Sequence, residues 1–115
     1  MRLHHIAFRT DDLARLEAFY AGVLGLTVKK RDGTRSVWLE SGDAMVMLEQ
    51  RESGEPHVPA GTMEMIAFAI STAERASYMH RLAAAGIAVE SQTAFTLYVR
   101  DPDGRRVGLR QYAFT

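Results

Sequence analysis

The sequence contains no cysteine, which excludes disulfide bonds, thiolate metal sites and a cysteine nucleophile. It also carries no net charge, because 14 Lys and Arg balance 14 Asp and Glu, whereas a nucleic-acid-binding protein normally has a basic surface. No apolar run approaches the roughly 20 residues of a membrane-spanning helix, and residues 1–5 carry no signal-peptide core. We therefore expect a cytoplasmic protein that binds neither nucleic acid nor a membrane.

What the sequence does contain is an internal repeat. With 115 residues, of which 47% are hydrophobic and 24% charged, the chain has the composition of one globular domain. Within it, Ile6-Ala7-Phe8 recurs as Ile66-Ala67-Phe68, an offset of 60. After each copy come a polar cap, an amphipathic helical segment ending at Gly, and three extended segments. The repeat predicts that residues 1–115 form a single domain built from two similar units.

The first unit, residues 3–49, begins with a predicted strand at 3–9. Apolar residues then recur at spacings of three and four, which indicates one buried helical face before the turn at Gly25. They are Leu13, Leu16, Phe19, Tyr20, Val23 and Leu24. Extended segments at 26–30, 36–40 and 44–49 complete a β-α-β-β-β order.

The second unit, residues 63–112, repeats this order after a linker at 50–62. Ser71 and Glu74 have the spacing of a capping box, and the helix they start ends at Gly86. Gly25 and Gly86 differ by 61, and we carry this offset unbroken through the remaining strands. On that alignment Trp38 and Tyr98 fall one position out of phase, so we expect them to face different sides of their sheets.

The predicted fold class is α+β, with two tandem β-α-β-β-β units. A unit of about 47 residues has one helix to cover one face of its sheet and leaves the other face uncovered. Two such sheets would enclose a shared cavity, with the halves supplied by one chain or by two. Alternation along the strands predicts which side chains face this cavity. They are His5, Arg9, Met45, Met47, Glu49, Met65, Arg106 and Arg110, a set rich in methionine and arginine.

Several segments together resemble the vicinal oxygen chelate superfamily, which includes glyoxalase I, bleomycin-resistance and fosfomycin-resistance proteins and extradiol dioxygenases. They are the paired units, the opening Leu3-His4-His5-Ile6-Ala7-Phe8, the run Val23-Leu24-Gly25-Leu26 and the turn Asp101-Pro102-Asp103-Gly104. The resemblance implies the glyoxalase-like fold and a homodimer, since relatives commonly pair.

The same resemblance implies metal ligands at four positions, one on the first and one on the last strand of each unit. They correspond to His5, Met47, Met65 and Gly108, where relatives have His or Glu. Only His5 matches. Because thioethers are poor ligands for hard divalent cations, we predict that no metal cofactor is bound. A soft Cu(I) site at His5, Met47 and Met65 is the less favoured reading of the same residues, since methionine commonly serves as flexible lining.

We therefore predict a small-molecule-binding protein whose cleft is lined by methionine and arginine and takes a partly apolar anion. The inward Arg9, Arg106 and Arg110 need either such a ligand or a carboxylate, and Glu49 could pair with Arg110. The alternatives are a divergent lyase, isomerase or dioxygenase that holds a divalent metal through His5 and Glu49, an enzyme with His5 as a metal-free base, and an accessory dimer with a vestigial cavity. His57 and His80 are expected at the solvated surface, and His4 on the helix side of its strand or in solvent.

Overall fold

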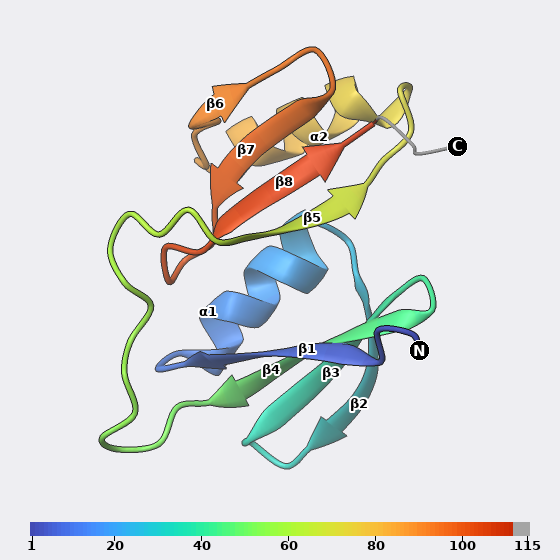
Figure 1. Ribbon diagram of the computed structural model, residues 1–115. Coiled ribbons are helices and arrows are strands. Elements are labelled where there is room, and N and C mark those ends of the chain that lie inside the picture. The colour runs from blue at the N-terminus through green and yellow to red at the C-terminus, as the bar shows by residue number, and fades with distance from the viewer. Residues whose placement is uncertain (112–115) are drawn as a thin grey trace. The chain divides into compact units, whose positions relative to one another are not determined.

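Strand β1 (His5–Thr10) opens the first unit, and the chain then passes through a short α1 (Leu13–Glu17) into a π-helical segment, η1 (Ala18–Val23). Strands β2 (Thr27–Asp32), β3 (Ser36–Ser41) and β4 (Ala44–Gln50) follow. They form a four-stranded sheet in the order β1-β4-β3-β2, in which β1 is parallel to β4 and the other neighbours are antiparallel (Figure 1). This computed structural model describes residues 1–111.

The second unit repeats that order. Strand β5 (Met65–Ala69) leads into α2 (Glu74–Ala84), which is followed by β6 (Ser91–Gln92), β7 (Thr96–Arg100) and β8 (Arg106–Arg110). The sheet order is β5-β8-β7-β6, with β5 parallel to β8. The chain divides into two compact units, residues 1–57 and 58–115. Residue 112, the predicted end of the second unit, lies outside the described residues.

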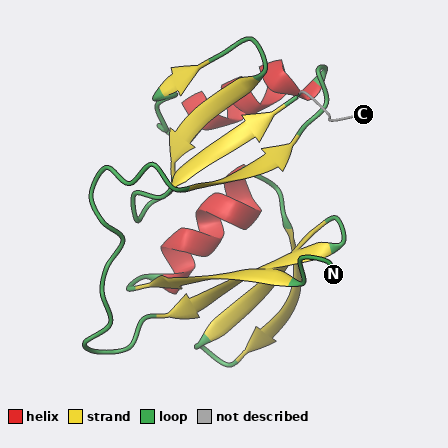
Figure 2. Cartoon of the chain, in the orientation of Figure 1, coloured by secondary structure: helices red, strands yellow, loops and turns green. Residues whose placement is uncertain are grey.

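The predicted α+β fold of two β-α-β-β-β units is confirmed. In Figure 2 the helix of each unit lies against one side of that unit's strands. The strands turn alternate side chains toward that side, where the core is apolar. The buried apolar residues of the strands are Val37, Leu39, Val46 and Leu48 in the first unit and Leu97, Val99, Val107 and Leu109 in the second. We call the opposite side of each sheet its helix-free face.

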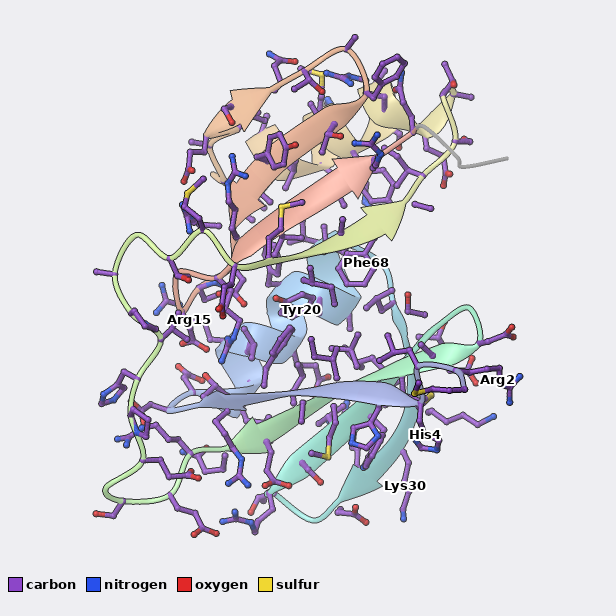
Figure 3. The ribbon with its side chains drawn as sticks, viewed as in Figure 1. Arg2, His4, Arg15, Tyr20, Lys30 and Phe68 are labelled. Atoms are coloured by element: carbon purple, nitrogen blue, oxygen red, sulfur yellow. The ribbon has the colours of Figure 1, made fainter. Side chains whose placement is uncertain are left out.

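The helix of the first unit follows the predicted apolar pattern but changes its hydrogen bonding halfway. Asp12 caps its start by accepting a hydrogen bond from the backbone N–H of Arg15 at 3.1 Å. Near its end the N–H of Leu24 donates to the carbonyl of Phe19, five residues back, which is the π-helical spacing. The buried Tyr20 ring (Figure 3) contacts Phe8 with ring centroids 5.7 Å apart, so this segment still packs on β1.

The helix of the second unit has the predicted capping box. Ser71 Oγ accepts from the N–H of Glu74 at 3.1 Å, and Glu74 Oε1 accepts from the N–H of Ser71 at 2.7 Å. The same backbone hydrogen bond holds the pKa of the Glu74 carboxyl below its ordinary value. Leu82 is the buried residue of this helix, with none of its surface exposed. In the described part of the chain, no helix is long and apolar enough to cross a membrane.

The expectation that Trp38 and Tyr98 face different sides of their sheets is wrong. Trp38 lies opposite Met47, and Tyr98 lies opposite Gly108, the position that corresponds to Met47. Strands β3 and β7 therefore align at an offset of 60, not 61. Counted between paired residues, the connection from Gln92 to Leu97 is one residue shorter than that from Arg31 to Val37, and the connection from Arg100 to Arg106 is one residue longer than that from Glu40 to Met45. Both aromatic rings belong to helix-free faces.

We expect the stability of the first unit to fall on acidification, in part through Glu17. Arg31 donates to both of its carboxylate oxygens, at 2.6 and 2.7 Å, and holds the Glu17 pKa below its ordinary 4.5. A depressed pKa stabilises the fold fully above the unfolded value, and the stabilisation is lost as the pH falls through the folded value. Thermal unfolding from pH 7 to pH 3 should show a shallower decline for Glu17→Gln than for the native chain. Equal declines would contradict this role for the pair.

Candidate functional site

On the helix-free face of the first unit, His5 packs against Trp38. Their ring centroids are 4.9 Å apart at an interplanar angle of 64°. His5 lies opposite Met45 across the β1–β4 pair, and Trp38 lies opposite Met47, so the two rings meet above β4. This brings three predicted cavity residues, His5, Met45 and Met47, onto one surface with a tryptophan. The surface is amphipathic, because an imidazole borders two thioethers and an indole.

One ring nitrogen of His5 is engaged by its neighbour. Nδ1 of His5 lies 2.8 Å from Nδ1 of His4, labelled in Figure 3 at the start of the chain. Since one nitrogen must donate and the other accept, at least one of the two rings is neutral in this arrangement. A metal ion at His5 Nδ1 would therefore have to displace His4.

Arg9 is paired with two carboxylates of its own unit. Its Nη2 lies 2.8 Å from Glu49 Oε1, and its Nη1 lies 3.2 Å from Glu55 Oε1. The three side chains together carry one net negative charge, which disfavours an anionic ligand at Arg9. Glu49, which we matched to Arg110 from the sequence, thus has an arginine partner on the adjacent strand.

His57 lies at the solvated surface as expected, with 67% of its side chain exposed, and it also has a charged partner. Its Nε2 lies 2.8 Å from Asp11 Oδ2, and Arg51 Nε donates to Asp11 Oδ1 at 2.8 Å. Arg51, and after it His57, lowers the pKa of Asp11. These contacts hold residues 50–57, the first part of the predicted linker, against the turn between β1 and α1. His57 therefore has a structural role as a partner of Asp11.

On the helix-free face of the second unit, Arg106 lies over the Tyr98 ring, with its Cζ atom 3.9 Å from the ring centroid. Its Nη2 donates to Ser91 Oγ at 3.3 Å, and its Nη1 lies 3.8 Å from Met65 Sδ. Its Nε is buried and, within residues 1–111, makes no hydrogen bond, although Glu90 Oε1 is 3.7 Å away. The guanidinium is therefore fixed in place by a ring but satisfied mainly by weak, uncharged acceptors.

Glu90 is shared between two arginines. Arg100 Nη2 donates to its Oε1 at 3.0 Å and Arg100 Nε to its Oε2 at 2.5 Å, while Arg106 approaches only to 3.7 Å. Arg100, as the largest cause, lowers the pKa of the Glu90 carboxyl. One carboxylate thus faces two guanidiniums, which leaves one positive charge on this cluster.

Gly108, which has no side chain, is buried between Arg106 and Arg110 on β8. The three residues share a face, and Arg110 Nη1 donates to Thr96 Oγ1 at 3.3 Å. A Cβ atom at Gly108 would lie 3.3 Å from Ala67 Cβ, 3.4 Å from Thr96 Cγ2 and 3.6 Å from Met65 Cε. We call this surface the arginine site; it comprises Thr96, Tyr98, Arg106, Gly108 and Arg110.

The four metal-equivalent positions offer a poor ligand set. His5 and Met47 lie in the first unit. In the second unit the methyl carbon of Met65 lies 3.6 Å from the point where a Cβ atom of residue 108 would stand. An apolar group therefore lies beside the position where a metal-binding side chain would start. Across the described residues, no group of three or more His, Asp or Glu is arranged to hold a metal ion. One imidazole and two thioethers do not suit a hard divalent cation.

The structure thus separates the predicted site residues into three groups. The first group shares a surface with Trp38 and consists of His5, Met45 and Met47. The second is the ion pair of Arg9 and Glu49. The third lines the helix-free face of the second unit and consists of Met65, Arg106 and Arg110. Sequence reasoning missed Glu90, Ser91, Thr96 and the stacking role of Tyr98. The signal available for Tyr98 was the offset of 60 already present in Ile6 and Ile66, which would have placed Tyr98 in register with Trp38.

Two β-α-β-β-β units with a mixed sheet each, and a polar set on the helix-free faces, define a glyoxalase-like protein. Residues 2–109 match the family model described as Glyoxalase/Bleomycin resistance protein/Dioxygenase superfamily. The chain belongs to this superfamily.

Among individual relatives, fosfomycin resistance proteins recur. The chain is 30% identical over 112 residues to glutathione transferase FosA of Serratia marcescens, covering 93% of this chain and 78% of that protein. It superposes on the fosfomycin resistance protein FosX of Mesorhizobium loti with a TM-score of 0.81 and 22% identity, over 98% of this chain and 93% of that one. A FosX variant of Listeria monocytogenes, complexed with Mn(II) and 1S,2S-dihydroxypropylphosphonic acid, gives 0.80 and 19%, over 98% and 91%.

Proposed function

We propose that this protein binds a small, partly apolar organic anion at the arginine site, and that it does so without a metal ion. The observation that carries the proposal is Arg106. Its guanidinium lies over the Tyr98 ring, yet its hydrogen bonds go to a hydroxyl and a thioether, and Glu90 is hydrogen-bonded to Arg100. A phosphonate or carboxylate oxygen would give the Arg106 guanidinium a charged hydrogen-bond acceptor. Within its own unit the charged group near it is Glu90, whose Oε1 is 3.7 Å from Arg106 Nε.

The surroundings of Arg106 fit an anion with a short apolar part. Arg110, four residues along the same strand, adds a second positive charge on the same face. Gly108 and Ala67 lie opposite each other between them, and the methyl groups of Thr96 and Met65 approach this position, so the surface between the two arginines is apolar. The thioether of Met65 supplies polarizable apolar surface at the edge. The relative crystallised with a phosphonic acid supports phosphonates as the first probes.

The alternative of a metal-dependent enzyme that uses His5 and Glu49 receives less support. His5 Nδ1 lies 2.8 Å from His4, and Glu49 lies 2.8 Å from Arg9. A metal ion at His5 Nδ1 would have to displace His4, and even with His5 Nε2 and a Glu49 oxygen as ligands these two residues provide only two donors. We therefore propose no step through a metal ion. The homodimer, the cytoplasmic location and the common cavity between two sheets stay predictions.

Propylphosphonate is expected to stabilise protein that has been treated with a chelator, whereas its neutral diethyl ester is expected to have no effect. A ligand at a hundred times its Kd adds about 2.7 kcal/mol to the free energy of unfolding, which raises Tm by several degrees. Differential scanning fluorimetry with the acid and the ester measures this directly. Equal shifts for the acid and the ester, or none with the acid, would argue against anion binding.

A further inference from the structure

Two exposed methionines of the second unit lie against arginines. Met65 is 45% exposed, and its sulfur lies 3.8 Å from Arg106 Nη1. Met63 is 65% exposed, and its sulfur lies 4.0 Å from Arg100 Nη2. In the sheet Met65 lies opposite Arg106, which in turn lies opposite Arg100. A thioether and two guanidiniums therefore form a row across β5, β8 and β7.

We propose that Met65 is a peroxide-sensitive sulfoxidation site, and that its oxidation withdraws Arg106 from the bound anion. The consequence for the anion rests on the proposed function; the oxidation and the capture of Arg106 do not. In the reaction the sulfur lone pair attacks one oxygen of hydrogen peroxide, and the S–O bond forms as the O–O bond breaks. The sulfur loses two electrons, and the departing hydroxide takes the proton of the attacked oxygen and leaves as water.

The geometry of the reduced protein suits the oxidised product. A sulfoxide S–O bond of about 1.5 Å and an N–H···O distance of about 2.8 Å span 3.8 Å when the angle at oxygen is about 120°. The sulfur already lies 3.8 Å from Arg106 Nη1, so the new oxygen fits between the two with little movement. Its lone pair then points at the donor.

The chemistry of the acceptor explains why oxidation would matter. A thioether is a weak acceptor, whereas a sulfoxide oxygen is strongly dipolar and accepts a charge-assisted hydrogen bond from a guanidinium. The oxidised side chain would compete with a ligand for the same cation. Met65 would thereby couple the peroxide level to the affinity of the arginine site.

Met79 provides a matched comparison within the same unit. It is 40% exposed, close to the 45% of Met65, but it lies on α2 and not on the helix-free face. Mild peroxide treatment followed by peptide mass spectrometry gives the oxidised fraction of each methionine. The nitrogen NMR signal of the Arg106 side chain, assigned with Arg106→Lys, reports its capture independently of any ligand.

We expect Met65 and Met79 to oxidise at rates within a fewfold of each other, and the Arg106 signal to move in proportion to oxidised Met65. Affinity for propylphosphonate should fall about tenfold and recover when methionine sulfoxide reductases of both epimer specificities are added. Met65→Leu should show one affinity before and after peroxide, whereas Met79→Leu should keep the full response.

Two results would overturn the inference. One is that Met65 stays reduced while Met79 is fully oxidised, and the other is that the NMR signal of the Arg106 side chain does not shift when Met65 is oxidised. A reduced protein that fails to bind propylphosphonate, but whose Arg106 signal still follows Met65, would refute the proposed function and support the sulfoxidation site.

Discussion

Arg106→Gln is expected to weaken the binding of propylphosphonate by about tenfold to a hundredfold. A hydrogen bond to a charged partner contributes about 1.5–3 kcal/mol, and each 1.4 kcal/mol is a factor of ten in Kd. Glutamine retains polar character and part of the packing on Tyr98 but loses the charge that the anion needs. Isothermal titration calorimetry on the native chain and the variant gives the ratio of the two dissociation constants.

Arg81→Gln is the matched control for this substitution. Arg81 also lies over a tyrosine, with its Cζ atom 5.0 Å from the Tyr78 ring, but it belongs to α2. Its replacement should leave the affinity within about twofold, because that arginine lies outside the arginine site. An equal loss in both variants would mean that the anion responds to overall charge and not to Arg106.

Leu82→Ala is expected to lower the free energy of unfolding by about 2–5 kcal/mol, because truncating a buried leucine removes apolar contacts and leaves a cavity. Leu82 has 0% of its surface exposed and is the buried residue of α2, so this helix depends on it for attachment to the core. Chemical denaturation followed by circular dichroism measures the change.

Met79→Ala, on the same helix at 40% exposure, serves as its control and should cost less than about 1 kcal/mol. Similar losses in the free energy of unfolding for both variants would show that exposed residues of α2 stabilise the unit as much as Leu82 does. A small loss at Leu82 alone would mean that the second unit tolerates partial detachment of its helix.

The fold could be predicted from the sequence because its signals are local and repeated. The spacing of Leu16, Phe19, Tyr20 and Leu24 indicates a buried helical face whether or not the hydrogen bonding is α-helical. The reciprocal bonds of Ser71 and Glu74 depend on residues three apart and were correctly expected. The change to π-helical bonding in η1 left no such mark, because it keeps the same face inward.

Register was harder to predict, because it depends on connection lengths that compensate each other. Trp38 and Tyr98 were misaligned by one position, since a shorter connection before β7 and a longer one after it cancel over the whole unit. A slip of one residue moves a side chain to the opposite face of a sheet. The offset of 60 at Ile6 and Ile66 does not by itself say which later strands keep it, so the strand pairing was needed to assign Tyr98 to the arginine site.

The partners of the arginines could not be predicted either, because they lie far apart in the sequence. Alternation correctly placed Arg9 and Arg106 on helix-free faces, but it treated them as equivalent. Glu55, 46 residues from Arg9, neutralises that side chain together with Glu49. Glu90 is instead taken mainly by Arg100. Only the competition among these pairs distinguishes a structural arginine from a candidate ligand contact.

The central claim is that the arginine site binds an anion without a metal ion, and calorimetric titration of propylphosphonate with and without Mn(II) tests it most directly. Protein stripped with a chelator and protein supplied with Mn(II) should give the same dissociation constant within about twofold, because Arg106 and not a metal ion supplies the positive charge. Binding that occurs only with Mn(II), and that is abolished by His5→Ala, would contradict the claim and favour the hypothesis of a metal-dependent protein.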